Sequence, residues 1–515
     1  MKKVLATVCF ILCSFMTFHG DCSAQNVNVT NAQTPTQESK SGLKWSRSFS
    51  DGALANNSIP ILAEEGIYLV AKNKLYLLSY KDGSIQKQLT LTASCDSVCN
   101  LLYENEKLYI PLHNGIVECV DTKNFSSLWQ SEAFGGQSLS TLSSYNGMLY
   151  GASTSIQQNK TTGVLYCLSE STGQTIWSYS NANGGYYWSG PYVMHNRLYV
   201  ADDDGTLMIH SLTSDEIYES IKLTDANIRA GFTYDESTNA LFTTTNKGEI
   251  IQIVFDKENE ITDTRTLSLS SSSRINCTST PTIYNGRLYV GSMIDGYGTL
   301  SVVDTKNMKC LYQAKAVKGG EIKSSPLLTT AYGNEWYLYF TCNITPGDIY
   351  VMKDSAGATS GEINALFLPE TNKQYCLSSV AAGKDGVLYY SNDSGTLFAV
   401  ESQPNKVVST PTPAPVVQRQ SSPQKTAKIT IKKPTKVKLK KTKKGYTLSW
   451  KSQKKLTTFI YMKKGKKKWK KVAKTTKTFY RISKKKRGYQ IRIRCGKKNK
   501  SKWYYSKYTT AKKIK

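Results

Sequence analysis

The fold is decided by a pattern that is clear in the segment Thr278-Ser-Thr-Pro-Thr-Ile-Tyr-Asn-Gly-Arg-Leu-Tyr-Val-Gly-Ser292. The pair Leu288-Tyr289 in this segment ends a short strand, and the same apolar-aromatic pair recurs along the chain. The aromatic members of the pairs are Tyr68, Tyr109, Tyr150, Tyr199, Phe242, Tyr289, Tyr339 and Tyr389. Successive aromatics are 41, 41, 49, 43, 47, 50 and 50 residues apart, so the chain contains eight copies of one unit.

Each copy continues into a turn and a second strand. The turns contain Gly115, Gly163, Gly205, Gly248, Gly298, Gly347 and Gly395, and the first copy has Asn73-Lys74 instead. Glycine and asparagine both tolerate the positive φ of a tight hairpin. Apolar and polar residues alternate around the turns, which predicts antiparallel strands. In several copies a third strand ends on an aromatic residue, such as Trp129, Trp177 or Tyr312.

Units of 40–50 residues with several short strands each predict the blades of a β-propeller, here over residues 43–403. The eighth copy runs to Ser402 and then stops without its last strand. An unpaired segment of the right kind, Leu43-Lys44-Trp45-Ser46, precedes the first copy. We therefore expect Trp45 to occupy in the eighth sheet the place of Trp129 in the second, so that the N-terminal strand closes the ring and removes an open edge.

The start of the chain predicts export. Met1-Lys2-Lys3, an apolar run from Val4 to Phe18 and small residues up to Ala24 are typical of a secretory signal peptide, residues 1–24. The protein is therefore expected to be secreted or held at the cell surface, and no segment is long enough to favour a membrane span. Residues 25–42, rich in Asn, Thr and Gln, are predicted to be flexible.

The basic residues are concentrated at the other end of the chain. Thr426 to Lys515 contain 36 Lys and Arg and no Asp or Glu, whereas the remaining 425 residues contain 31 basic and 38 acidic residues. The formal net charge of +29 is therefore a property of one terminal module, which predicts contact with a polyanion. Residues 404–427 are rich in Pro, Ser and Thr and predict an extended linker. Apolar residues alternate with lysines in residues 428–515, which predicts six or seven strands of a small sandwich.

Two families resemble these patterns. The repeats over residues 43–403 resemble those of pyrroloquinoline-quinone-type propellers, and Thr172, Gly173 and Trp177 match the tryptophan-docking motif of that family. The resemblance implies an all-β fold with an eight-bladed propeller. Trp450 and Tyr489 resemble the core tryptophan and the tyrosine corner of fibronectin type III domains, and the module is also similar to lysine-rich ends of secreted proteins of Gram-positive gut bacteria.

The propeller family includes quinone-dependent dehydrogenases and non-catalytic scaffolds. Dehydrogenases of the methanol type typically carry an adjacent Cys–Cys pair and bind calcium or a lanthanide, but this chain has no Cys–Cys dipeptide, and its repeats are near minimal length. We therefore predict no catalytic residue, metal site or cofactor, with a quinone-dependent oxidoreductase as the alternative. The run Asp202-Asp203-Asp204 before Gly205 is interpreted as a solvated hairpin turn rather than a metal site.

The cysteines give little guidance. Three of the twelve lie in the signal peptide, and nine remain. Cys95 and Cys99 are close enough to pair, the others are predicted to be buried apolar residues, and the pairing of the nine stays open.

The candidate sites are binding sites. In the propeller, Tyr186, Tyr187 and Trp188 form an aromatic run that could bind sugar or peptide, unless Trp188 packs between blades. The basic module is predicted to hold an anionic polymer of the envelope, such as teichoic acid, capsule or mucin glycan, unless its charge serves solubility alone. The candidate residues are Lys466, Lys467, Lys468, Lys470, Lys471, Lys484, Lys485, Lys486 and Arg487. The predicted function is that of an exported, monomeric scaffold for a protein or glycan partner, and the signal peptide argues against nucleic acid.

Overall fold

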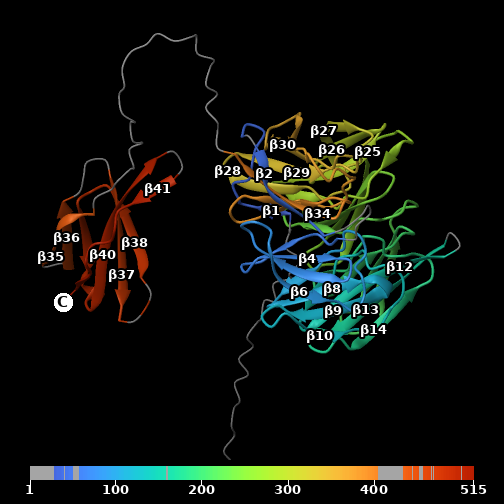
Figure 1. Ribbon diagram of the computed structural model, residues 1–515. Helices are drawn as coiled ribbons and strands as arrows, with labels where there is room; N and C mark the ends of the chain where they lie inside the picture. The colour runs from blue at the N-terminus through green and yellow to red at the C-terminus, as the bar shows by residue number, and fades with distance from the viewer. Residues whose placement is uncertain are drawn as a thin grey trace, which may run out of the picture. The chain divides into compact units, whose positions relative to one another are not determined.

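The computed structural model describes residues 28–39, 41–49, 57–157, 160–403, 433–442, 445–451, 456–465, 467, 469–499 and 502–514 (Figure 1). The chain divides into two compact units, Met1–Val408 and Ser409–Lys515. The predicted signal peptide, residues 1–24, and the predicted linker, residues 404–427, lie outside the described residues. In the described ranges nearly all regular secondary structure is β-strand, and none of their helices has the length and apolar character needed to cross a bilayer.

The first unit consists of eight sheets that follow one another along the chain. The first sheet contains β3 (Ile61–Leu62), β4 (Ile67–Ala71), β5 (Lys74–Leu78) and β6 (Ile85–Thr90), and the second contains β7 (Leu102–Glu104), β8 (Lys107–Leu112), β9 (Ile116–Asp121) and β10 (Ser126–Gln130). The third sheet contains β11 (Ser143–Tyr145), β12 (Met148–Gln157), β13 (Lys160–Ser169) and β14 (Thr175–Asn181), and the fourth contains β15 (Tyr192–Met194), β16 (Arg197–Ala201), β17 (Thr206–His210) and β18 (Ile217–Lys222). A 3-10 helix, η1 (His113–Gly115), forms the turn between β8 and β9.

The other four sheets repeat this arrangement. The fifth sheet contains β19 (Thr233–Asp235), β20 (Ala240–Thr244), β21 (Glu249–Phe255) and β22 (Ile261–Ser268), and the sixth contains β23 (Ile275–Asn276), β24 (Thr282–Tyr284), β25 (Arg287–Ile294), β26 (Tyr297–Asp304) and β27 (Lys309–Lys318). The seventh sheet contains β28 (Leu327–Tyr332), β29 (Glu335–Thr341), β30 (Ile349–Ser355) and β31 (Ile363–Phe367), and the eighth contains β32 (Ala381–Ala382), β33 (Leu388–Ser391) and β34 (Thr396–Ser402). Neighbouring strands within each copy are antiparallel, as the alternating pattern predicted.

The eight sheets are the blades of a closed propeller, because each packs on the next through its own apolar cluster. Adjacent side chains on a strand point to opposite faces, so each apolar-aromatic pair contributes to two clusters. Leu288 packs with Phe242 of the fifth blade, and Tyr289 packs with Leu338 of the seventh. Seven such clusters join blades one to eight in order, and an eighth joins the eighth blade to the first. The predicted eight-bladed ring is confirmed.

The N-terminal strand closes this ring. Strand β2 (Ser41–Ser48) pairs antiparallel with β34 and is the outer strand of the eighth blade, as Figure 1 shows for the blue and orange ribbons. Trp45 lies opposite Ala399, just as Trp129 lies opposite Cys119 in the second blade. In both sheets the register shifts immediately before the tryptophan, so the two strands share even this irregularity. The predicted placement of Trp45 is therefore confirmed.

The outer-strand tryptophans dock on the following blade. The Trp45 indole N–H donates to the carbonyl of Tyr80 at 3.1 Å, and a Cβ at Gly83 would lie 2.6 Å from the ring. Trp129 donates in the same way to Glu170 at 3.1 Å and packs on Gly173. Glycine is needed at both positions, because a side chain there would occupy the space of the indole. The docking contact therefore ties each of these blades to its neighbour.

The segment between the predicted signal peptide and the ring differs from its prediction. Residues 25–42 were predicted to be flexible, but within them β1 (Val29–Thr30) pairs in parallel with β28 and adds a fifth strand to the seventh blade. Thr34 is buried, and its hydroxyl donates to the hydroxyl of Tyr339 at 2.7 Å. The polar composition misled the prediction, because these threonines are satisfied by hydrogen bonds within the fold rather than by water.

The second unit is a two-sheet sandwich. One sheet contains β35 (Thr435–Thr442), β36 (Gly445–Lys451) and β39 (Phe479–Ser483), and the other contains β37 (Thr457–Lys464), β38 (Lys470–Thr475), β40 (Tyr489–Asn499), β41 (Lys502–Tyr505) and β42 (Lys512–Lys513). The 3-10 helix η2 (Lys484–Lys486) follows β39. Side chains of both sheets form one core around Trp450, Ile460 and Ile493. The predicted small β-sandwich is confirmed, with eight strands instead of six or seven.

Candidate functional site

The predicted aromatic run lies in the loop that leads from β14 of the third blade to β15 of the fourth. Its first member, Tyr186, is fully buried and packs in the cluster between these blades, so it cannot be a surface ligand residue. Tyr187 and Trp188 are half-buried, and Trp188 has a φ of +62°, which turns the chain at this point. The run therefore divides, because the chain bends at Tyr187 and Trp188 directly after the buried Tyr186. Two of the three predicted residues face outward.

Tyr187 is joined to the next loop by an arginine. Arg229, between β18 and β19, lies with its guanidinium 4.6 Å from the centre of the Tyr187 ring. Its Nε and Nη2 donate to the two carboxylate oxygens of Asp203 at 3.0 and 3.1 Å. Burial raises the pKa of Asp203, and the hydrogen bonds and charge of Arg229 oppose that rise. The arginine side chain is 31% exposed, so it presents a fixed cation at the surface.

Trp188 is joined to a loop three blades further on. The ammonium of Lys323, between β27 and β28, lies 5.8 Å from the centre of the Trp188 ring. Glu321, which is buried, lies 3.7 Å from the same ammonium and accepts two hydrogen bonds from Asn276 at 2.8 and 2.9 Å. Loops of the fourth, sixth and seventh blades thus meet here. Together, Tyr187, Trp188, Arg229 and Lys323 form what we call the central-loop cluster.

The sequence did not predict the two cations of this cluster. Arg229 and Lys323 are single basic residues in loops almost a hundred positions apart, and no local pattern singles them out. The signal that could have found them is positional: both follow an outer strand and precede the first strand of the next blade, as Trp188 does. Such loops lie at one end of a propeller, where binding residues commonly gather.

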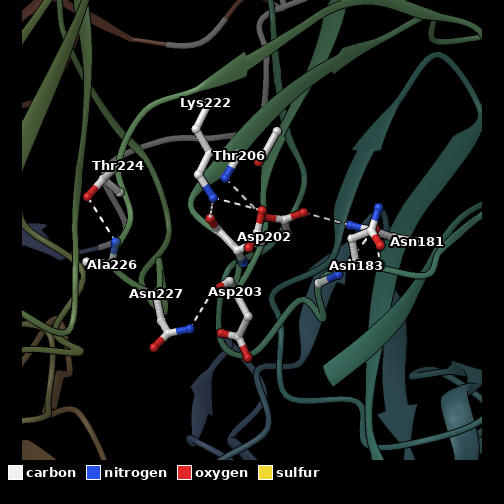
Figure 2. A network of polar contacts seen from close by, with 11 residues as sticks. Asn181, Asn183, Asp202, Asp203, Thr206, Lys222, Thr224, Ala226 and Asn227 are labelled. Carbon is white, nitrogen blue, oxygen red and sulfur yellow. Dashed lines mark hydrogen bonds and ion pairs between the residues drawn. The ribbon is translucent and has the colours of Figure 1, made fainter. Parts of the chain in front are cut away.

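The acidic run beside the cluster is a hairpin turn, although it is less solvated than predicted (Figure 2). Asp202 and Asp203 are both 3% exposed, and only Asp204 faces solvent. One carboxylate oxygen of Asp202 accepts the backbone N–H groups of Asp204 and Thr206, both at 3.0 Å, and the other accepts the Asn181 amide at 2.7 Å. Burial raises the pKa of Asp202, and these hydrogen bonds partly compensate. The run therefore fixes the turn that carries Asp203 toward Arg229.

The predicted basic residues of the second unit are exposed and fall into two separate groups. Lys470 and Lys471 begin the edge strand β38 of the larger sheet. Lys484, Lys485 and Lys486 form η2, and Arg487 follows them, after the edge strand β39 of the smaller sheet. Lys467 is exposed as well, whereas Lys466 and Lys468 lie outside the described residues. The described residues of this predicted set thus lie on edge elements of both sheets, and their role in binding a polyanion stays a prediction.

The buried thiols supply no further chemistry. All nine cysteines after the predicted signal peptide are free in the structure, and eight of them are buried. A hydrogen bond with Cys95, together with burial, raises the pKa of Cys99 well above its usual range. The two thiols predicted to be close are thus neighbours, and the raised pKa of Cys99 disfavours its reactive thiolate form.

The fold defines the class of the first unit as an eight-bladed β-propeller, and comparisons with known proteins add the following. Residues 27–179 match a family model described as "Outer membrane protein assembly factor BamB". No curated protein sequence matches the chain. Similar solved structures include the quinohemoprotein alcohol dehydrogenase ADHIIG from Pseudomonas putida HK5, at 11% identity and a TM-score of 0.53, covering 76% of this chain and 81% of that one.

A second dehydrogenase and a BamB protein are similar as well. The quinohemoprotein alcohol dehydrogenase from Comamonas testosteroni has 11% identity and a TM-score of 0.54 over 76% of this chain and 81% of its own. BamB from Moraxella catarrhalis has 12% identity and a TM-score of 0.50 over 69% of this chain and 99% of its own. At such identities the likeness shows the fold alone.

The two buried carboxylates in contact with the central-loop cluster do not fit a quinone held by a metal ion. A divalent cation needs several free carboxylate or amide oxygens, yet Asp203 is occupied by Arg229, and Glu321 by Asn276 and Lys323. Within the described ranges, His, Cys, Asp and Glu nowhere gather in groups of three or more that could hold a metal. What the central-loop cluster offers instead is two aromatic faces and two oriented cations.

Proposed function

We propose that this is an exported, non-catalytic binding protein, in which the propeller holds a partner and the basic module retains the protein on anionic polymers of the cell envelope. The observation that carries the proposal is the separation of charge along one chain. The module has 36 basic residues and no acidic one, whereas the rest of the chain is slightly acidic. A module whose charged residues are all positive is attracted to a polyanion, whereas the slightly acidic remainder of the chain is not.

Retention by this module needs no single strong contact. Each basic residue near an anionic surface contributes on the order of 1 kcal/mol, so several weak contacts hold the protein firmly. Binding to a dense polyanion also releases counterions, which makes it steeply dependent on salt. The exposed lysines of both sheets and of η2 are suited to this kind of contact.

The experiment compares the full chain with a chain that ends at residue 403, which keeps all eight clusters between the blades. We expect the full chain to sediment with cell walls that carry teichoic acid and the shortened chain to stay in solution. Retention should fall sharply between 0.1 and 1 M salt, where the Debye length shrinks from about 10 Å to about 3 Å. Equal binding to walls stripped of anionic polymer, at high salt, would contradict the proposal.

The central-loop cluster supports the second half of the proposal, that the propeller binds a protein or glycan. Aromatic faces such as Tyr187 and Trp188 stack on sugar rings or apolar side chains, and Arg229 and Lys323 pair with carboxylate or phosphate groups. We therefore expect a partner that presents acidic groups beside a flat or apolar surface.

The test is an array of acidic and neutral oligosaccharides and peptides, probed with the full chain. Trp188→Ala and Arg229→Gln should each abolish the signals that the wild type gives with acidic probes. Tyr218→Ala removes an exposed aromatic residue, 53% exposed on the outer strand β18, and should leave them unchanged. Equal losses in all three variants would show that the cluster is not the site.

A further inference from the structure

The smaller sheet of the basic module carries an ordered set of cations on its outer face. Its register places Lys440 beside Thr447 and Thr447 beside Arg481, in a row across β35, β36 and β39. The next row with the same orientation consists of Lys438, Ser449 and Phe479. The residues between the rows, such as Leu448, point into the core. The central strand therefore presents short hydroxyl side chains between flanking strands that bear long cations.

This arrangement leaves a shallow trough. An open hollow of about 550 Å³ lies at one end of the face. It is lined by Lys436, Lys438, Ser449, Trp450, Lys451, Thr478 and Phe479. Phe479 is 42% exposed, which is unusual for so large an apolar side chain. The hollow thus combines an apolar wall, hydroxyl donors on its floor and ammonium groups along its rim.

The outer face of the larger sheet is different, because three of its cations, Lys463, Arg492 and Arg494, already have partners. Arg492 lies 4.3 Å from the ring centre of Trp469 and 3.9 Å from that of Tyr508. Lys463 lies 5.3 Å from the Trp469 ring, and the Arg494 guanidinium donates to the Tyr461 hydroxyl at 3.0 Å.

On the smaller sheet the situation is reversed. Five cations here have side chains with no hydrogen-bonding, ionic or aromatic partner among the residues that the structure describes: Lys436, Lys438, Lys440, Lys451 and Arg481. Cations that are held apart from one another and left unpaired lower their energy most by binding an external anion. The smaller sheet is therefore the face of the module that is best prepared for a polyanion.

We propose that this outer face of β35, β36 and β39 binds one chain of a phosphodiester polymer, such as the polyol phosphate of a teichoic acid, along the trough. The inference rests on the proposed function and assigns it a site. Lysine suits phosphate as a compact point charge, and Ser449 and Thr447 donate hydrogen bonds to further phosphate oxygens. Alternate residues on a strand are about 6.6 Å apart, an interval similar to that between phosphates joined by a short polyol. The spacing of Lys438 and Lys440 thus fits successive phosphates.

The experiment measures binding of the full chain to fluorescently labelled poly(glycerol phosphate) by anisotropy, at several salt concentrations. The triple variant Lys438→Gln, Lys440→Gln, Arg481→Gln should weaken binding on the order of 100-fold, as expected for three lost contacts near an anionic chain. The slope of log affinity against log salt should fall by about one for each lost contact. Ser449→Phe fills the trough without changing charge and should also weaken binding, with the folded state checked by thermal unfolding.

The matched control removes three charges elsewhere on the module. Lys507→Gln, Lys512→Gln, Lys513→Gln has the same charge loss at exposed positions on the side of the larger sheet, and should weaken binding only slightly. Equal losses in the two triple variants would overturn the site. Equally tight binding of hyaluronate, with the same losses, would overturn the assignment to phosphodiesters. A wild type that binds neither walls nor this polymer at low salt would instead overturn the proposed function.

Discussion

At the scale of single residues, the buried His210 is expected to make folding stability depend on pH. Its ring is fully buried, lies nearly parallel to the Trp177 ring with centres 5.9 Å apart, and has Nδ1 3.3 Å from the Asp215 carbonyl. Burial lowers the pKa of His210 to about 4. Between pH 6.5 and 4, His210 is protonated in the unfolded chain but stays neutral in the folded chain. Because the unfolded state binds the extra proton, the free energy of unfolding falls as the pH falls.

The change His210→Phe should remove this part of the acid sensitivity. The expected difference in the free energy of unfolding, comparing pH 7.5 with pH 4, is about 3 kcal/mol for this one group. Melting curves of both proteins over that range measure it. A variant whose stability declines with acid as steeply as that of the wild type would contradict the assignment of a neutral, buried imidazole.

Gly173 makes a second prediction at this scale. It has a φ of +71°, and a Cβ at this position would lie 2.3 Å from the Trp129 ring. Gly173→Ala should therefore cost backbone strain and the docking contact, about 2–4 kcal/mol together. Gly147→Ala is the control, because Gly147 has a φ of +76° but nothing within 4 Å of the added Cβ. Urea unfolding should show the smaller loss for Gly147→Ala, and equal losses would mean that the indole does not need the glycine.

At the scale of elements, strand β2 is expected to contribute strongly to the stability of the closed propeller. Trp45→Ala empties a buried slot between the eighth and first blades, and should cost roughly 3–5 kcal/mol. Leu43→Ala on the same strand is the control, because Leu43 is 46% exposed and should change stability by less than about 0.5 kcal/mol. Thermal unfolding of the two variants measures the difference.

Removing residues 28–49 is a larger change than a single substitution in β2. It deletes both β1 and β2, and so leaves the outer edge of β34 unpaired. We expect such a chain to melt earlier and to aggregate, since a bare strand edge pairs with other molecules. An unchanged melting temperature in a soluble, monodisperse sample would show that closure is not important to the fold.

The elements also show what the sequence could predict. The repeat, the number of blades and the closing strand followed from period and spacing, because a blade repeats the same burial in the same order. Strand β1 did not, because Thr30 and Thr34 look like linker residues until their hydrogen-bond partners, some three hundred residues away, are known. Local composition therefore predicts the burial of apolar side chains well, but it predicts poorly the burial of polar groups whose hydrogen bonds are formed within the fold.

The candidate sites were predicted less well for a related reason. The run of Tyr186, Tyr187 and Trp188 was found by composition, but composition could not say that Tyr186 faces the core. The cations of the central-loop cluster come from separate blades and meet only in three dimensions. In the basic module every segment is rich in lysine, so density alone could not separate cations that have aromatic partners, such as Arg492, from those of the smaller sheet that have none.

At the scale of the whole molecule, the propeller fold is shared by alcohol dehydrogenases and by BamB, so activity has to be measured. Purified protein, supplied with pyrroloquinoline quinone and calcium, should show no dye-linked oxidation of alcohols or aldoses. The physical reason is that Asp203 and Glu321, the buried carboxylates in contact with the central-loop cluster, are already occupied by cations and an amide. Saturable binding of the cofactor with turnover would contradict the proposed function.

Closure by the N-terminal strand has a consequence for the order of events during synthesis. Ser48 pairs with Thr396, so β2 leaves the ribosome about 350 residues before its partner strand. At roughly 5–20 residues per second, this interval is on the order of 20–70 s. For that time the strand is an unpaired edge, and the seven blades made meanwhile form an open arc. Anything that shields a short amphipathic strand during this delay, such as a holding chaperone, would then raise the yield of closed rings more than it raises their stability.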